Sequence, residues 1–168
     1  MISQEPLGCC GMRPPPEGLF SVHVVHMLID GGATGVQFAA PKPECLGASY
    51  ISDTPVLPMT SGNSQTGVAV DYGMCVGFSS TPFHVLTINF IVTSQTPDCC
   101  VWGPIAFGGQ GTVINVTDCD GNVVEGQGVA NVVNPSGICM CEFGDQCVPL
   151  AVERSTWGAI KSLYVSIN

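Results

Sequence analysis

One apolar segment constrains this chain more than any other, because it can be satisfied only inside a core. The segment Phe83–Val92, FHVLTINFIV, is the longest nearly continuous apolar run in the sequence. Alternate residues from Leu86 to Val92 share one face at the two-residue period of a β-strand, and the β-branched and aromatic content favours a strand over a helix. Pro82 and Pro97 bracket the run, and proline is excluded from central strand interiors. We expect the middle strand of a β-sandwich, buried by both sheets.

Other short segments have the same character and are separated by Gly, Pro, Asn and Asp. They are Phe20–Ile29, Thr34–Ala40, Ala48–Ile51, Gln65–Tyr72, Cys99–Phe107, Gly111–Asp118 and Asn122–Val133. About seven to nine short strands with turn signals between them are typical of a sandwich or jelly roll. The sequence therefore predicts an all-β fold with a single β-sandwich or jelly roll.

Turn residues predict which neighbours pair. Cys119-Asp120-Gly121 joins two alternating runs, and Asp-Gly in that position is a strong hairpin signal. Asp30-Gly31-Gly32 follows Phe20–Ile29, so we also expect that segment to form a hairpin with Thr34–Ala40.

The two ends of the chain differ from the middle. Residues 1–18 contain Pro14-Pro15-Pro16 and little apolar sequence, which predicts an extended, irregular arm, with the β-sandwich domain spanning residues 19–168. Ser155–Tyr164 has a capping residue and apolar positions at helical spacing, so it predicts one short C-terminal helix. Met1–Gly18 is too polar for a signal peptide, which suggests that the numbering begins near a mature end.

Cysteine content indicates the compartment. The chain has ten cysteines in 168 residues, and an even, high count predicts disulfides and a secreted, extracellular or cell-surface location. We expect all of them to act as disulfide cysteines: Cys9, Cys10, Cys45, Cys75, Cys99, Cys100, Cys119, Cys139, Cys141 and Cys147.

Two cysteine doublets have a mechanical meaning. Adjacent side chains on an extended chain point to opposite sides, so each member of Cys9-Cys10 and of Cys99-Cys100 is expected to pair with a different segment. The pairings we expect are Cys45 with Cys75 across a long loop, and one of the second doublet with Cys119. The first doublet is expected to join the cluster at 139–147.

Charge limits the partners. Charged residues make up only 10% of the chain and the net charge is −9, against about 25% charged residues in an ordinary globular protein. Four scattered cations make no basic patch, so nucleic acid and anionic membranes are not expected partners. No apolar run approaches the roughly 20 residues of a membrane span. The low charge indicates either a polar uncharged surface or burial against partners, and we favour burial against copies of the same chain.

Few residues suggest chemistry. His23 and His26 lie three apart in HVVH, and an odd separation on a strand puts them on opposite faces, which argues against a shared metal. Asp118 to Glu125, DCDGNVVE, resembles a calcium loop but lacks the glycine required there, so a hairpin turn is the simpler interpretation.

Other chemical interpretations are weaker still. Cys139, Cys141 and Cys147 match no strong zinc pattern. No nucleophile, base and orienter set can be named, so neither an enzyme nor a cofactor or metal is predicted. Asn115-Val116-Thr117 is an N-glycosylation sequon, which marks Asn115 as the candidate glycosylation site.

Three stretches resemble a known family. They are Glu153–Tyr164 (ERSTWGAIKSLY), the stretch from Cys45 through Gly62-Asn63 and Gly67–Val70 to Cys75, and the stretch from Cys99-Cys100 to Asp118-Cys119. Together they resemble an uncharacterised family of secreted, cysteine-containing proteins from uncultivated environmental bacteria, similar to cohesin-like and Ig-like sandwiches. The resemblance covers most of residues 20–164, and it implies self-assembly into extracellular fibrils but no active site.

Two functions from different classes follow. The first is a structural subunit of an extracellular filament or surface assembly, whose terminal segment adds a strand to the next copy. Its candidate assembly residues are Ile2, Leu7, Tyr164, Val165 and Ile167, with the N-terminal arm as the better donor. The second is a monomeric module that binds a carbohydrate or another ligand through exposed aromatic residues. Its candidate residues are Tyr50, Tyr72, Trp102 and Trp157.

Overall fold

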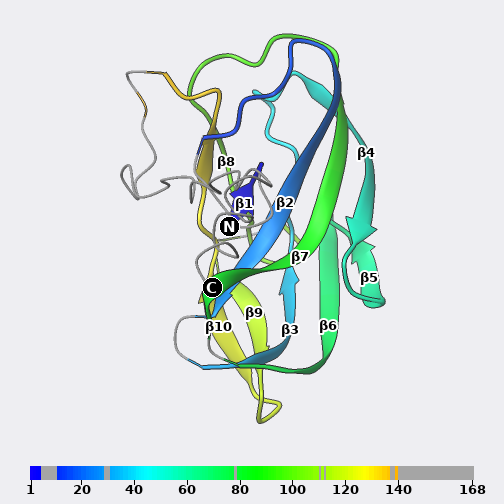
Figure 1. The fold of residues 1–168 in the computed structure, drawn as a ribbon, viewed down its shortest axis with the longest axis vertical. Coiled ribbons are helices and arrows are strands. Elements are labelled where there is room, and N and C mark those ends of the chain that lie inside the picture. The colour runs from blue at the N-terminus through cyan, green and yellow to red at the C-terminus, as the bar shows by residue number, and fades with distance from the viewer. Residues whose placement is uncertain are drawn as a thin grey trace, which may run out of the picture.

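The computed structural model describes residues 1–4, 11–28, 31–77, 79–109, 111, 113–136 and 139. These residues form eleven β-strands in three antiparallel sheets (Figure 1) and contain no helix. The predicted all-β class is therefore confirmed. The predicted helix at Ser155–Tyr164 lies outside the described residues.

The first sheet contains the long central strands. Its order is β1-β2-β7-β4, and the bounds are β1 Ile2–Ser3, β2 Gly18–Leu28, β4 Ala48–Pro55 and β7 Ser79–Val92. The ladder between β2 and β7 runs from the Gly18–Val92 pair to the Leu28–Ser79 pair, so it spans nearly the full length of the sheet.

The second sheet is wider and its order is β10-β9-β3-β6-β5. Its bounds are β3 Ala33–Phe38, β5 Met59–Asn63, β6 Gly67–Val76, β9 Val113–Asp118 and β10 Val123–Gln127. A small third sheet pairs β8 Cys100–Trp102 with β11 Asn131–Val133. Buried residues from all three sheets form one hydrophobic cluster, so the two larger sheets pack as the layers of a sandwich-like fold.

Aromatic contacts join the small sheet to the first one. The Phe90 ring lies 5.3 Å from the Trp102 ring in an edge-to-face arrangement, and 6.1 Å from the Tyr50 ring. Such pairs contribute beyond the area that they bury. Phe90 on β7 is fully buried, so it is the point at which β4, β7 and β8 meet.

The predicted central strand is confirmed in part. β7 lies between β2 and β4, and the face from Leu86 to Val92 is buried in the core. The expectation that sheets cover both of its faces is wrong. Its outer face carries Thr87 and Asn89, which are half-buried, and Ile91, which is exposed, because among the described residues one layer packs against β7, on its inner face.

One predicted hairpin is confirmed and the other is wrong. β9 and β10 pair across the Asp120-Gly121 turn as expected. β2 and β3 do not pair, because β2 bonds to β7 while β3 bonds to β6 and β9 in the other sheet. A Cβ on Gly32 would lie 2.4 Å from the Cys119 sulfur and 2.7 Å from the Val76 carbonyl oxygen. The glycine therefore permits a close crossing between sheets rather than a hairpin turn.

The N-terminal segment takes part in the core. Ile2 and Met12 are fully buried, and β1 pairs Ile2 with Val24. The Asn131 side chain donates to the Ile2 carbonyl, and the Met12 backbone bonds to Val132 and Asn134. Within residues 1–4 and 11–18, the segment therefore packs against the rest of the same chain instead of forming an irregular arm.

Three disulfides are present among the described cysteines, and the pairs are Cys45–Cys100, Cys75–Cys119 and Cys99–Cys139. Cys9, Cys10, Cys141 and Cys147 lie outside the described residues. The doublet at 99–100 does join two different segments, as predicted. Cys99 has a left-handed backbone conformation, with φ of 64°, at the point where the two cysteines turn towards different segments.

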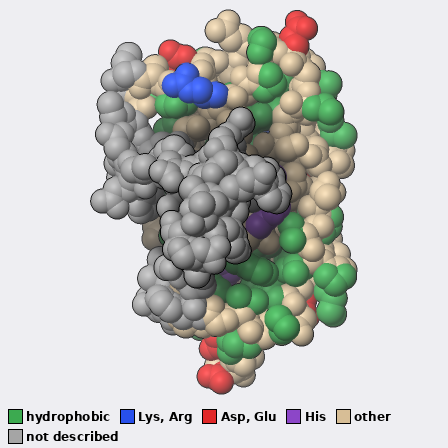
Figure 2. Space-filling view, viewed as in Figure 1, with side chains coloured by type: hydrophobic (Ala, Val, Ile, Leu, Met, Phe, Trp, Pro, Cys, Tyr) green, Lys and Arg blue, Asp and Glu red, His purple; other side chains and the backbone are tan. Residues whose placement is uncertain are grey.

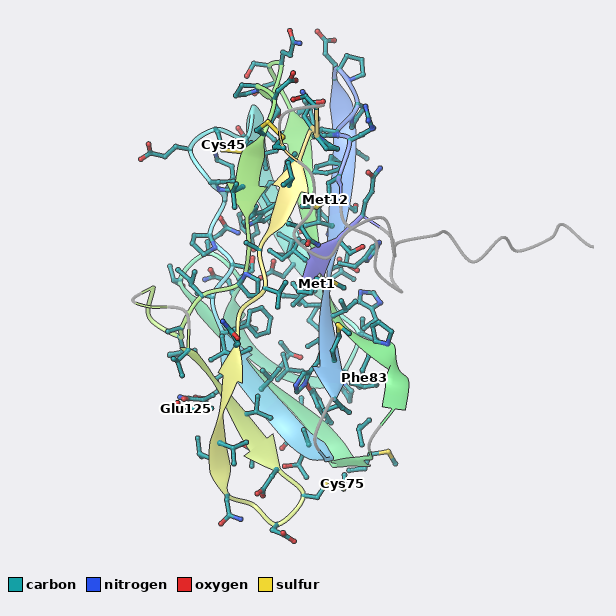
Figure 3. All side chains as sticks on the ribbon, turned by 90° about the vertical axis from the view of Figure 1, so that its left-hand side faces the viewer. Met1, Met12, Cys45, Cys75, Phe83 and Glu125 are labelled. Atoms are coloured by element: carbon teal, nitrogen blue, oxygen red, sulfur yellow. A yellow bond between two sulfur atoms is a disulfide. The ribbon has the colours of Figure 1, made fainter. Side chains whose placement is uncertain are left out.

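The predicted pairings of Cys45 with Cys75, and of the doublet with Cys119, are wrong. Strands β4 to β6 carry Cys45 and Cys75 to opposite ends of the molecule, as Figure 3 shows. Each therefore pairs with the cysteine at its own end, which is Cys100 for one and Cys119 for the other.

Two disulfides of similar span allow burial to be separated from chain entropy. Cys45–Cys100 and Cys75–Cys119 have sequence separations of 55 and 44, so loop closure alone gives each about 4 kcal/mol. Cys100 is buried and Cys75 is exposed. We expect the Cys45→Ser/Cys100→Ser pair to lower the free energy of unfolding by about 1–3 kcal/mol more than Cys75→Ser/Cys119→Ser, because it leaves a buried hydroxyl. Urea unfolding of both variants measures this, and equal losses would contradict it.

Candidate functional site

An apolar cavity lies between the two larger sheets, on the side where β1 and β10 are their edge strands. We call it the intersheet cavity. Its volume is about 450 Å³, which lies within the range of small-molecule and peptide-anchoring pockets. Its apolar walls come from β2, β3, β7, β9 and β10, and include Val24, Val36, Val85, Ile114, Val116 and Val124.

The rim of the intersheet cavity carries the few polar groups. Met1 and Glu125, both labelled in Figure 3, border it together with His26 and Gln127. Gly126 lies between the two polar residues of β10, and a Cβ there would lie 2.9 Å from side-chain carbons of Ile114 and Val116. Glycine at this position therefore lets the Ile114 and Val116 side chains approach the β10 backbone closely, where a Cβ would clash with them.

His26 links the cavity to the second sheet. Its Nδ1 lies 2.7 Å from the Tyr72 hydroxyl. This contact joins β2 to β6 across the core. Burial, and to a smaller extent the charge of the Met1 amino group, lower the pKa of His26 to about 4. Burial also raises the pKa of the Tyr72 hydroxyl. The pair is therefore neutral near pH 7 and acts as a hydrogen bond inside the core.

Two strand edges flank the cavity. β10 pairs only with β9 among the described strands, and β1 pairs with β2 only at Ile2 and Ser3. Beyond the backbone bonds between Met1 and Val25, no described strand covers that edge of β2. Val123 on β10 and Met27 on β2 are exposed, so each of the two edge regions has an exposed apolar side chain.

A polar network covers part of the outer face of the first sheet. The His23 Nδ1 lies 3.2 Å from His84 Nε2 and 3.0 Å from Thr87 Oγ1, and His84 Nε2 lies 3.1 Å from the same oxygen. We call these three residues the histidine triad. Next to it, the Ser21 hydroxyl donates to Asn89, which donates in turn to Thr54.

A β-bulge explains why the alternation of residues in the sequence does not predict that the triad residues share one face. The β2–β7 register runs from His23–Thr87 and Val24–Leu86 directly to Val25–His84, so Val85 is the extra residue on β7. A bulge of this kind moves the following side chain to the other face. His84 therefore shares the outer face with Thr87, although their separation of three predicts opposite faces.

The histidine environments differ. His26 contacts Tyr72 of the second sheet while His23 lies on the outer face, which confirms that these two lie on opposite sides of β2. Burial lowers the pKa of His84, and a hydrogen bond with the Leu86 backbone opposes that shift.

The remaining predicted residues fall into separate places. Asn115 is exposed on the outer face of the second sheet, where it pairs with Gln37 and Glu125, and its glycosylation stays a prediction. Of the predicted assembly residues, Ile2 is buried, and the others lie outside the described residues: Leu7, Tyr164, Val165 and Ile167.

An aromatic binding platform is not formed by the residues predicted for it. Tyr72 and Trp102 are buried in the core and Tyr50 is half-buried, while Trp157 lies outside the described residues. They are core residues because each packs on an aromatic neighbour, such as Phe83 against Tyr72. The prediction of exposed rings is therefore wrong for Tyr72 and Trp102.

The turn at Asp118 and the disulfide at Cys139 bear on the two other metal interpretations. Asp118 accepts hydrogen bonds from the backbone N–H groups of Asp120 and Asn122, and bonds to Asn122 hold its pKa low. The carboxylate thus stabilises the hairpin turn. Cys139 is bonded to Cys99 and offers no thiolate for zinc.

Comparison with protein-family models gives no match, and a search of curated proteins finds no similar chain. The interpretation of both sites therefore depends on the geometry of this chain. Among the described residues, no helix is long and apolar enough to cross a membrane.

The depressed pKa of His26 predicts a specific acid sensitivity. Above pH 6.5 the residue is neutral in both the folded and unfolded chain, so it has no effect on stability. Between pH 6.5 and about 4 the unfolded chain binds a proton that the folded chain resists, so stability falls by about 3 kcal/mol over that range. His26→Gln keeps a partner for Tyr72 and removes this loss.

Urea unfolding at pH 7.5 and pH 4.0 checks this expectation. The difference between the two pH values should be smaller in the His26→Gln variant than in the wild type by about 3 kcal/mol. The Met1 amino group, whose pKa burial lowers to about 6, is present in both proteins, so the comparison isolates the loss that depends on His26. An equal pH difference in both proteins would contradict the assignment.

Proposed function

We propose that this domain is a structural subunit of an extracellular assembly, in which a terminal strand of one copy docks into the intersheet cavity of the next. The observation that carries the proposal is the apolar cavity flanked by two strand edges. An extended segment can bond to such an edge through its backbone and place alternate side chains in the cavity.

The surface composition supports association. Several large apolar side chains are exposed, including Leu19, Ile51, Met59, Met74, Val101 and Val123. Figure 2 shows few charged side chains on the face that it presents, mostly towards its upper and lower ends. With 10% charged residues, the chain has little charge repulsion to keep copies apart.

Three disulfides support the extracellular part of the proposal. Structural disulfides persist in oxidising compartments and are rare in the cytosol of most organisms. They also restrict the unfolded chain, which suits a subunit that is exposed to proteases and has no cellular environment to protect it.

The C-terminal segment is the better donor. The N-terminal candidate Ile2 is already buried in its own subunit, so releasing it would open the core. Tyr164–Asn168, YVSIN, alternates in a way that puts Val165 and Ile167 on one face of an extended strand. Those two side chains are the ones that we assign to the cavity of the neighbouring copy.

A head-to-tail contact of this kind does not close on itself, so it generates a filament. Each copy would offer one donor and one acceptor at different places on the domain. Occupation of the cavity by the same chain's own C-terminal segment would instead give a monomer, and the experiment below distinguishes these outcomes.

Substitutions in the donor test the proposal directly. Ile167→Asp places a charge on the face assigned to the cavity, and we expect it to abolish filaments because a buried, unpaired carboxylate is strongly disfavoured. Ser166→Asp adds the same charge to the opposite face and should leave filaments intact. Negative-stain electron microscopy and sedimentation velocity measure the result. Equal behaviour of the two variants, or a wild-type chain that stays monomeric at high concentration, would contradict the proposal.

A matched pair of substitutions tests the acceptor. Val124 lines the cavity on β10, whereas Val113 lies on β9 outside it, and both are exposed. We expect Val124→Lys to raise the critical concentration for polymerisation at least tenfold. Val113→Lys should have little effect on it. Thermal unfolding of the two variants controls for stability. Loss of assembly in Val113→Lys alone would place the contact elsewhere.

A further inference from the structure

We propose that the histidine triad, His23, His84 and Thr87, binds one divalent transition-metal cation, of which zinc and copper are the best candidates. This inference goes beyond the assembly proposed above and does not depend on it. The site lies on the outer face of the first sheet, away from the intersheet cavity.

The donor spacing suits a single metal ion. The two imidazole nitrogens are 3.2 Å apart, and the Thr87 oxygen lies 3.0 Å from one and 3.1 Å from the other. Ligands about 2.0–2.2 Å from a metal lie roughly 3.0–3.5 Å apart at right-angled or tetrahedral positions. A cation just above the plane of the three atoms can therefore contact all of them with small shifts.

The backbone holds the donors on rigid elements. His23 and Thr87 are directly paired across the β2–β7 ladder, and the bulge at Val85 brings His84 to the same face. His23 and Thr87 also pair with residues of the flanking strands, Ser3 on β1 and Thr54 on β4, so these two donors are held on both sides. Sites on such elements are more precise than sites on loops.

The Nε2 atom of His84 faces both other donors of the triad, at 3.2 Å from His23 Nδ1 and 3.1 Å from the Thr87 oxygen. In a neutral imidazole one ring nitrogen carries the proton and the other has a free lone pair. With the proton on Nδ1, the Nε2 lone pair is available to a metal ion.

The donor set indicates the class of metal. Imidazole nitrogens suit zinc, copper and nickel, whereas calcium and magnesium prefer oxygen. No third His, Cys, Asp or Glu joins the two histidines within the described part of the chain. Solvent would complete the coordination, and the net charge of −9 favours a bound cation.

The competing explanation is a hydrogen-bonded triad with no metal, in which Thr87 donates to one ring and accepts from the other. Metal titration of the full chain separates the two explanations. The protein is purified with its disulfides intact, its free thiols are alkylated, and it is dialysed against a chelator, since thiolates also bind these metals. Zinc chloride is then titrated by isothermal calorimetry.

We expect one zinc ion per chain. His23→Gln and His84→Gln should each weaken binding at least about tenfold, which is the smallest effect found even for outer-shell partners. His26→Gln is the matched control and should leave the affinity unchanged. Thr87→Val should weaken binding, and Thr87→Ser should restore it. Thermal unfolding without metal confirms that each variant is folded.

Copper gives a second readout that does not depend on any variant. The electron paramagnetic resonance spectrum of the wild-type chain with one equivalent of copper(II) chloride should show coupling to two imidazole nitrogens. Absence of binding up to millimolar zinc and copper would overturn the proposal. Binding that survives both His23→Gln and His84→Gln would also overturn it, because the metal would then lie elsewhere.

Discussion

The ladder between β2 and β7 is the interaction on which the rest of the structure depends. Its inner face supplies Val22, Ile88 and Phe90 to the core, and its two outer neighbours, β1 and β4, attach to it. A bulge at Val85 interrupts the register, and a second irregularity follows between His26 and Leu28. Removing this ladder would leave the five-stranded sheet with an uncovered apolar face, so the remaining layers have no independent stability.

Sequence periodicity predicted the parts of the fold that follow a simple repeat. Phe83–Val92 reads as a strand because its apolar residues alternate, and the β9–β10 hairpin follows from Asp120-Gly121 in its turn. The two-residue period of a strand no longer predicts the face of a side chain where a β-bulge inserts one extra residue. His84 could not be placed from its spacing to Thr87, because the bulge at Val85 is a tertiary feature with no local signal.

Long-range partners were predicted less well, and the physical reason is the same for sheets and disulfides. Strand pairing is decided by how whole faces fit, so β2 pairs with β7 across a long stretch of chain instead of with its neighbour β3. Once the strands are placed, Cys45 and Cys75 lie at opposite ends of the molecule (Figure 3), and each pairs with the cysteine beside it. The intersheet cavity also arises only when both sheets are in place.

The proposed acceptor and the proposed metal site use opposite faces of the same ladder. Val24 and Val85 point into the intersheet cavity, whereas His23 and His84, next to them in sequence, form the outer triad. The bulge produces both results, because it adds Val85 to the inner face and turns His84 outward. A metal held by the triad would clamp β2 to β7 at this irregular point, where the ladder lacks a regular pair. The acceptor wall would then be stiffened from behind, so the two sites are mechanically connected even though their ligands never meet.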